Sequence, residues 1–252
     1  MSATPTRATP TKLAPIRGPS DNHPAVQLDR VQRLVAGTFT ERGVLVLAFG
    51  ALLLRISTLT WGAGVGEYDG FYHPDESKAW RSTQGFPENY LSNSNYLYGT
   101  AVQYVIGLLL LPVKLAWQAG HPFFPSLAYT EFVVLAVRAV HALLGSLTVV
   151  LVFWLGKIVF DRTAALIAAL LLAVSFHHAL NSAFATLDVP MSFLVTLVLV
   201  LAARAVTARR LRDFLFLGVA TGALFGTKLN GAVIVVPLAV LFALSLAARP
   251  EA

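Results

Sequence analysis

Long hydrophobic runs separated by short polar segments dominate the chain from residue 43 onward. An α-helix needs ~20 mostly apolar residues to cross the hydrocarbon core of a bilayer. Six runs approach that length, and they are 43–61, 131–157, 162–180, 189–207, 213–228 and 230–248. A seventh run, 98–118, is interrupted by Pro112 and Lys114. The pattern predicts an all-α integral membrane protein with about six transmembrane helices.

The charged residues between the runs predict how the helices are oriented. The segments 1–42 and 204–213 are rich in arginine, whereas the charged residues of 62–97 are mainly acidic. Cytoplasmic loops carry the excess of Lys and Arg in membrane proteins. If 98–118 crossed the membrane, the arginines of 204–213 would lie outside. We therefore predict that 98–118 is a juxtamembrane helix in a long first external loop, 62–130, and that both termini are cytoplasmic.

Composition divides the chain into three parts and excludes several classes of function. Residues 1–42 are polar and lack periodicity, so we predict a disordered cytoplasmic tail, followed by a transmembrane module over 43–248 and a short tail at 249–252. The sequence has no cysteine, which excludes disulfides and thiolate chemistry. Its net charge of +6 comes from Lys and Arg at the ends of hydrophobic runs. This distribution indicates membrane topology and argues against nucleic-acid binding.

Polar residues that are unusual in a membrane protein gather, in this topology, near the external face. They are Arg55, Asp75, Glu76, Arg138, His141, His177, His178, Asp188 and Lys228. Ionisable residues near a bilayer usually mark function. Cations at this depth suit a lipid phosphate, and a nearby carboxylate can act as a general base. Together they predict group transfer from a lipid-phosphate carrier in a multi-pass protein of the plasma or inner membrane.

Each of these residues also has a purely structural explanation. Asp75, Glu76 and Asp188 could cap helices, Arg55 and Lys228 could anchor spans at the interface, Arg138 and His141 could join packed helices, and His177 and His178 could be interfacial polar residues. A transporter is disfavoured because no span is broken by Gly or Pro at mid-membrane with paired charges.

A series of motifs runs in order along residues 43–248. They are His-Pro-Asp-Glu at 73–76, Asn-Tyr-Leu-Tyr-Gly at 95–99, Arg138 with Ala-Leu-Leu-Gly at 142–145, Phe-Asp-Arg-Thr-Ala-Ala at 160–165, Thr-Leu-Asp-Val-Pro at 186–190, and Gly-Val-Ala-Thr-Gly at 218–222 leading to Thr227 and Lys228. The series resembles the N-terminal module of the C-type-fold membrane glycosyltransferases, specifically the protein mannosyltransferase-like family.

The resemblance implies transfer of a sugar from a polyprenyl-phosphate donor to an acceptor at the external face, with inversion at the anomeric carbon. It implies that Asp75 is the catalytic base and that Glu76 orients it. The same two carboxylates are the candidate ligands if a divalent cation, Mg²⁺ or Mn²⁺, is used. The implied residues around the donor are Arg138 and Lys228 as phosphate ligands, Asp188 as a second acidic group, and His177 and His178 as weaker phosphate-binding candidates.

Members of this family usually extend further, with additional spans. We therefore expect the chain to be either a fragment or a short form that works with a partner subunit in the lipid bilayer. The alternative function is a non-catalytic subunit of a membrane complex that retains the glycosyltransferase-like fold.

Overall fold

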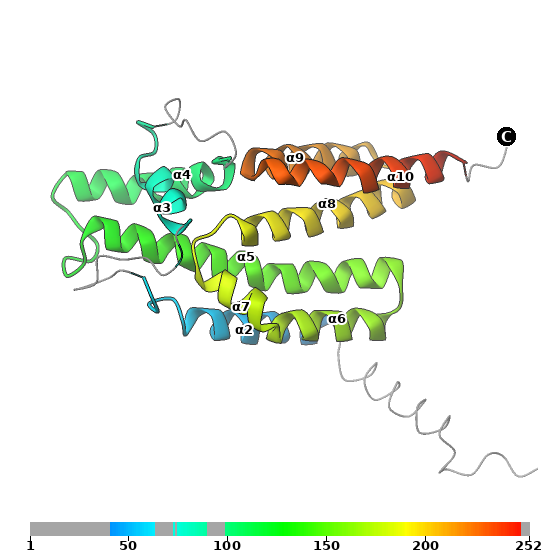
Figure 1. The fold of residues 1–252 in the computed structure, drawn as a ribbon, viewed down its shortest axis with the longest axis horizontal. Helices are drawn as coiled ribbons and strands as arrows, with labels where there is room; N and C mark the ends of the chain where they lie inside the picture. Colours follow the sequence, from blue (N-terminus) through cyan, green and yellow to red (C-terminus); the bar gives the residue numbers. More distant parts are fainter. Residues whose placement is uncertain (1–40, 64–72, 74, 90–98, 248–252) are drawn as a thin grey trace, which may run out of the picture. The chain divides into compact units, whose positions relative to one another are not determined.

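A computed structural model of the protein describes residues 41–63, 73, 75–89 and 99–247. Met1–Thr38 form a unit separate from Phe39–Ala252, and the described residues belong to the second unit. All regular structure in the described part is helical, which confirms the all-α class there (Figure 1). The elements are α2 (Glu41–Ile56), α3 (Glu76–Gln84), α4 (Ala101–Gln118), α5 (Tyr129–Val159), α6 (Arg162–Val174), α7 (Phe176–Ala183), α8 (Asp188–Ala208), α9 (Leu211–Thr227), the 3₁₀ helix η1 (Leu229–Ile234) and α10 (Val235–Ala247).

The helix α5 runs through the middle of the bundle, with α2 and α6 along one side and α8 to α10 along the other (Figure 1). It packs against α2, α6, α7 and α8. Small residues allow these close contacts: a side-chain carbon added at Gly145 of α5 would overlap the hydroxyl of Ser182 in α7. The buried apolar side chains of α5, such as Val137 and Phe153, form the centre of the core.

Several predicted turns are found where the sequence placed them. The turn between α5 and α6 contains Asp161, whose Oδ1 accepts a hydrogen bond of 2.9 Å from the backbone N–H of Ala164 and so caps α6. At the other end of the bundle, α9 ends at Thr227, and Lys228 has an extended backbone with φ of −156°. Both turns leave polar groups at helix ends.

Among the residues that the structure describes, four helices are long and apolar enough to cross a membrane, and the pair α6 and α7 makes a fifth if it is counted as one span. The helices α2 and α9 are shorter, with 16 and 17 residues. The count of six spans therefore stays a prediction. So does the juxtamembrane placement of 98–118, because α4 is one of the four helices that qualify by length and composition.

The span predicted over 162–180 is bent, because the chain turns by 53° between α6 and α7, and the pair still counts as one possible span. The break lies at Ser175, whose ψ of 118° is not helical. A side chain from α2 compensates for it: the guanidinium of Arg55 donates to the carbonyl oxygen of Ala173 at 3.3 Å and to Nδ1 of His178 at 2.8 Å. Arg55 is fully buried, so it does not anchor the span at the membrane surface.

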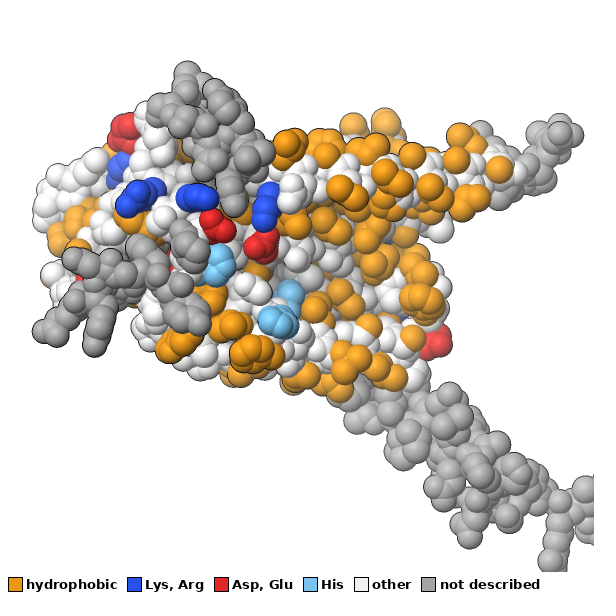
Figure 2. All heavy atoms as spheres, viewed as in Figure 1, with side chains coloured by type: hydrophobic (Ala, Val, Ile, Leu, Met, Phe, Trp, Pro, Cys, Tyr) orange, Lys and Arg blue, Asp and Glu red, His pale blue; other side chains and the backbone are white. Residues whose placement is uncertain are grey.

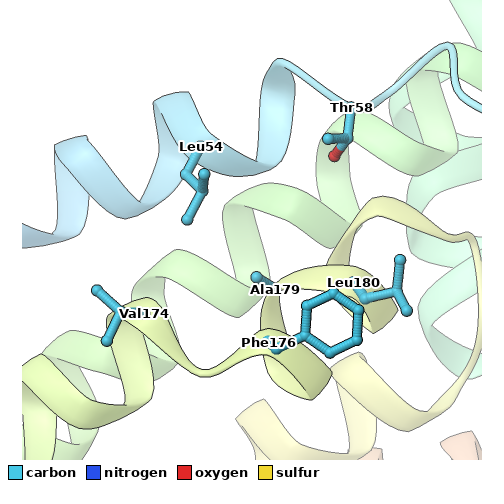
Figure 3. A pocket seen from close by; sticks show the side chains of 6 residues that line it. All are labelled: Leu54, Thr58, Val174, Phe176, Ala179 and Leu180. Carbon is cyan, nitrogen blue, oxygen red and sulfur yellow. The ribbon is translucent and has the colours of Figure 1, made fainter.

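A pocket of about 280 Å³ lies beside this break. Figure 3 shows that Leu54 comes from α2, Thr58 from the turn that follows it, and the rest from the end of α6 and from α7. The others are Val174, Phe176, Ala179 and Leu180. The lining is almost entirely apolar, so the pocket suits a hydrocarbon chain.

The two ends of the bundle differ in charge as the topology predicts. The turn between α5 and α6 and the turn between α8 and α9 lie toward one end (Figure 1). The C-terminal ends of α2 and α9 and the N-terminal ends of α5 and α8 lie toward the other. The basic turns are thus separated from the candidate functional residues. Which end faces the outside stays a prediction.

Candidate functional site

A buried ion pair joins α3 to α5. Glu76, the first residue of α3, and Arg138 in α5 are both 0% exposed. Arg138 binds the carboxylate with two nitrogens, since Nε lies 2.5 Å from Oε1 and Nη2 lies 2.7 Å from Oε2. Such a bidentate, charge-assisted pair is the geometry in which a buried arginine and a carboxylate satisfy each other best.

The remaining donors of Arg138 hold the segment that follows α2. Nη1 donates to the carbonyl oxygens of Leu59 and Trp61 at 2.6 and 2.8 Å, and Nη2 donates to that of Gly62 at 3.0 Å. A guanidinium has five N–H donors, so all five are used within the protein. Arg138 therefore has no donor left for a lipid phosphate, and it acts as the frame of this end of the bundle.

The segment that leads into α8 is attached to the same network. The backbone N–H of Ala185 donates to Oε1 of Glu76 at 3.0 Å. The ring of the buried Phe184 lies 5.5 Å from the Arg138 guanidinium carbon and 5.7 Å from the His73 ring centroid. Glu76 and Phe184 thus fix the loop before Asp188 against the loop that contains His73.

Asp75 precedes Glu76 but has very different surroundings. Its side chain is 37% exposed, and its Oδ1 accepts a hydrogen bond of 2.9 Å from Nζ of Lys78. It occupies the N-cap position of α3 without making a side-chain cap, so helix capping does not explain it. Its backbone N–H donates to Nδ1 of His73 at 3.3 Å.

Electrostatics connect Asp75 to the end of α9. The hydrogen bond from Lys78 is the main reason that the pKa of Asp75 lies below its usual value. The positive charges of Lys78, His73 and Lys228 lower it further, against a smaller opposing effect of burial. Asp75 is therefore ionised at neutral pH, and Lys228 is close enough to contribute.

Lys228 and Asp188 form the second exposed ion pair of the site. The distance between Lys228 Nζ and Asp188 Oδ1 is 2.5 Å, with side chains 19% and 52% exposed. Asp188 is the first residue of α8, but it makes no helix cap, because the N-cap residue is Leu187. The pair instead ties the start of α8 to the residue that follows α9.

A close backbone contact positions the end of α9. A side-chain carbon added at Gly99 would overlap the carbonyl group of Gly226, two residues before Lys228. The segment entering α4 therefore packs directly on the last turn of α9. Glycine is required there because no other residue lets the two backbones approach so closely.

The polar side chains of this end are gathered on one face. Figure 2 shows Lys or Arg, Asp or Glu and His side chains together near α3 and the end of α9, while hydrophobic side chains cover the helices to their right. The two ion pairs, Lys78 with Asp75 and Lys228 with Asp188, contribute to this charged face.

Two of the three other histidine candidates belong to helix packing. His178 binds Arg55 at the break between α6 and α7, and its neighbour His177 is exposed. His141 is fully buried, and its Nδ1 lies 2.7 Å from the carbonyl oxygen of Val137 in the preceding turn. No contact in the described part of the chain joins any of the three to Asp75 or Lys228.

The adjacent carboxylates do not form a pair of metal ligands. Both oxygens of Glu76 accept hydrogen bonds from Arg138 in a buried site, and Asp75 lies outside it with Lys78. Within the residues that the structure describes, no group of three or more His, Asp or Glu side chains could hold a metal ion.

Sequence reasoning missed Lys78 and the pairing of Glu76 with Arg138. Two signals were present in the sequence. Lys78 follows Asp75 by three residues, the spacing at which side chains meet on one helical face. Arg138 lies in a hydrophobic span, where a charge is usually paired with another charge. Nothing in the sequence indicates that the backbone N–H of Ala185 donates a hydrogen bond to Glu76.

Comparison with known proteins supports the resemblance found in the sequence. The family described as dolichyl-phosphate-mannose-protein mannosyltransferase matches residues 124–250, about half of the chain. No curated protein and no solved structure matches the chain. The matched region contains Arg138, Asp188 and Lys228, whereas Asp75 and Glu76 precede it. The all-helical fold and the matched region agree, and the chain belongs to the dolichyl-phosphate-mannose-protein mannosyltransferase family.

Proposed function

We propose that this protein transfers mannose from a polyprenyl-phosphate-mannose donor to a hydroxyl acceptor at the membrane face that carries Asp75. Family membership supports the glycosyltransferase class. The observation that carries the assignment of the site is the exposed, ionised Asp75 next to the Lys228 and Asp188 pair. The basic turns at the opposite end of the bundle support an external location for this face.

The chemistry follows from the surroundings of the two charges. Asp75 accepts the proton of the acceptor hydroxyl as the acceptor oxygen forms a bond to C1 of mannose. The bond between C1 and the phosphate oxygen breaks, and the polyprenyl phosphate leaves with the electron pair. Lys228 stabilises the negative charge on that phosphate. A single displacement of this kind inverts the anomeric centre.

The buried pair gives the reaction its geometry without touching the substrate. Arg138 and Glu76 fix the first turn of α3, so the backbone of Asp75 is held against α5 and the loop before α8. We therefore assign Arg138 and Glu76 as positioning residues. A misplacement of a catalytic group by about 1 Å is enough to slow a reaction ~100-fold.

The pocket at the break between α6 and α7 supports a place for the isoprenoid chain of the donor. Its lining from Leu54, Phe176 and Leu180 is apolar, as a hydrocarbon requires. The helix α7 then leads through the buried residues 182–187 to Asp188. In this arrangement the chain lies among the helices and the phosphate lies near Lys228.

The test measures mannose transfer by the wild-type protein and by Asp75→Asn. Each protein is placed in liposomes that contain radiolabelled polyprenyl-phosphate-mannose, and these are mixed with membranes that carry the acceptor. Loss of a general base lowers transfer by about 10²- to 10⁴-fold. Asp161→Asn is the matched control, because Asp161 caps α6 at the other end of the bundle and asparagine caps equally well. Wild-type transfer by Asp75→Asn would remove the assignment of the base. No release of mannose by the wild-type protein would favour a non-catalytic subunit.

A further inference from the structure

Both exposed carboxylates of the charged face are bound to a lysine. Lys78 Nζ lies 2.9 Å from Asp75, and Lys228 Nζ lies 2.5 Å from Asp188. The first pair stands at the start of α3, and the second joins the start of α8 to the end of α9. The charge of Lys228 also acts on Asp75, so the two pairs are neighbours.

Two other cations that pack against α3, Arg138 and Lys114, are held by buried hydrogen bonds within the protein. Arg138 spends its five donors on Glu76 and three carbonyl groups. Lys114 is buried in α4, and its Nζ donates to the carbonyl oxygens of Gln84 and Phe86 and to Glu88. An anion cannot take either one without breaking a buried network. Lys78 and Lys228 instead bind the exposed carboxylates of Asp75 and Asp188, and another anion can replace an exposed carboxylate.

The pairing of Lys78 with Asp75 opposes the proposed role of Asp75. The ammonium group of Lys78 occupies Oδ1, one of the two carboxylate oxygens that could accept a proton. It also makes the carboxylate a weaker base, because it stabilises the ionised form. Departure of Lys78 would therefore make Asp75 a stronger base with both oxygens available.

We propose that Lys78 is a second ligand of the donor phosphate and that the phosphate draws it away from Asp75. This inference rests on the proposed function. The phosphate oxygens take the ammonium groups of Lys78 and Lys228, and Asp75 is left as a free carboxylate next to the anomeric carbon. No proton moves in this step, because the carboxylate, the phosphate diester and the ammonium groups keep their charges. Donor binding thus precedes activation of the base.

A consequence is that the pKa of Asp75 differs between the free and the donor-loaded enzyme. Loss of the Lys78 hydrogen bond and arrival of a phosphate anion both raise it. The charged groups facing Asp75 are His73, Lys78 and Lys228, with Asp188 behind Lys228. Glu76 is neutralised by Arg138 on the α5 side, and Lys114 is paired with Glu88 on the α4 side.

Lipid-phosphate binding tests the exchange without relying on catalysis. The probe is radiolabelled polyprenyl phosphate, which lacks the sugar, bound to the purified full chain in detergent. Lys78→Met should weaken binding about tenfold or more, as expected for the loss of a charge-assisted hydrogen bond. Asp75→Asn should tighten binding, because Lys78 no longer has to leave a charged carboxylate to reach the phosphate. Lys157→Met is the matched control at the opposite end of α5 and should bind as the wild type does.

A double-mutant cycle separates exchange from simple electrostatics. If the phosphate and Asp75 compete for Lys78, the gain from Asp75→Asn disappears in the Lys78→Met background. If Asp75 only repels the phosphate through space, the two effects add and the proposal is overturned. Lys78→Arg, which keeps the cation, should bind nearly as tightly as wild type. Thermal unfolding of every variant identifies any loss of folding.

The pH dependence of transfer provides the second readout. The acid limb of kcat/KM reports the free enzyme and that of kcat the loaded enzyme. In the wild type, the limb of kcat should lie at higher pH. In Lys78→Met, the limb of kcat/KM should move up and the separation should shrink. An unchanged separation in an active Lys78→Met protein would refute the inference alone, whereas full activity of Asp75→Asn would refute the proposed function.

Discussion

Glu76 and Asp75 are adjacent carboxylates that the fold treats in opposite ways. Glu76 is completely buried, and its oxygens accept three hydrogen bonds from Arg138 and Ala185. Asp75 is 37% exposed and is bound to Lys78 on the same short helix. The first carboxylate is saturated by groups that come from distant parts of the chain. The second is bound by one flexible side chain that can leave.

The difference shows how a membrane protein separates structure from chemistry within one dipeptide. A buried ion pair with all its donors and acceptors satisfied is difficult to rearrange, because breaking it leaves a charge in a low-dielectric environment. An exposed pair contributes little to stability, because water can replace either partner. The saturated pair thus supplies position, and the exposed pair supplies a group that is able to react.

The largest expected effect is on the buried carboxylate. Glu76→Gln removes the charge without changing the shape and leaves Arg138 unpaired, which should destabilise the protein by about 3–5 kcal/mol. Asp75→Asn, the same change one residue earlier, should shift stability by less than about 1 kcal/mol. Thermal unfolding in detergent measures both. Equal losses of stability in the two variants would mean that the buried and the exposed carboxylate contribute equally to the stability of the fold.

The double variant Glu76→Leu with Arg138→Met sharpens this result. Replacing a buried ion pair by apolar residues is often close to neutral. Here Arg138 also binds the carbonyl oxygens of Leu59, Trp61 and Gly62, which would lose their donors. We therefore expect only partial recovery relative to Glu76→Gln, measured by the same unfolding experiment. Complete recovery would show that the carbonyl contacts contribute nothing.

A second, smaller loss of stability is expected where α9 meets the segment entering α4. Gly99→Ala places a carbon on the backbone of Gly226 and should cost about 1–3 kcal/mol as the two segments move apart. Gly218→Ala, in the middle of α9 with open space around it, should stabilise the helix slightly and serves as the control. Because Lys228 follows this contact, Gly99→Ala should also weaken lipid-phosphate binding. Equal stability of the two variants would contradict the close approach.

Much of this arrangement could be predicted from the sequence, because hydrophobic runs and charged turns are local signals. The runs located α2, α5, α8 and α9 to within a few residues. The residues predicted to carry function did separate from the basic turns, as Asp75 and Lys228 illustrate. These features depend on whether each residue favours water or lipid. A single stretch of sequence is enough to specify that preference.

Features that depend on tertiary contacts could not be predicted in the same way. The break at Ser175 lies inside an unbroken hydrophobic run, and it is stabilised by Arg55, which precedes it by 120 positions. The role of Arg138 depends on three carbonyl groups that any sequence would supply. Sequence reasoning therefore identified the charged residues at this end of the bundle but not the groups that they contact.

The exposed pair at the end of α9 should have a still smaller effect on stability. Lys228→Met breaks its contact with Asp188, whose side chain is 52% exposed, so we expect a change below about 1 kcal/mol. Binding of polyprenyl phosphate should nevertheless fall about tenfold, since a phosphate ligand is lost. Unfolding and lipid binding measured on the same sample distinguish the two effects. A large loss of stability would place Lys228 with Arg138 as a structural residue.

The smallest effect concerns the pH dependence of the pair between Asp75 and Lys78. The pKa of Asp75 is lowered in the folded protein, mainly by the hydrogen bond from Lys78. Its contribution to stability is therefore present above the unfolded pKa of about 4 and is lost as the pH falls through the folded value. Lys78→Met removes this contribution, so its stability should approach that of the wild type as the pH is lowered from about 6 to about 3. The pair is partly exposed to water, which screens the interaction. The difference in stability between the two proteins should therefore change by only a few tenths of a kcal/mol. A gap that widens on acidification would show that Lys78 stabilises the fold through contacts other than Asp75.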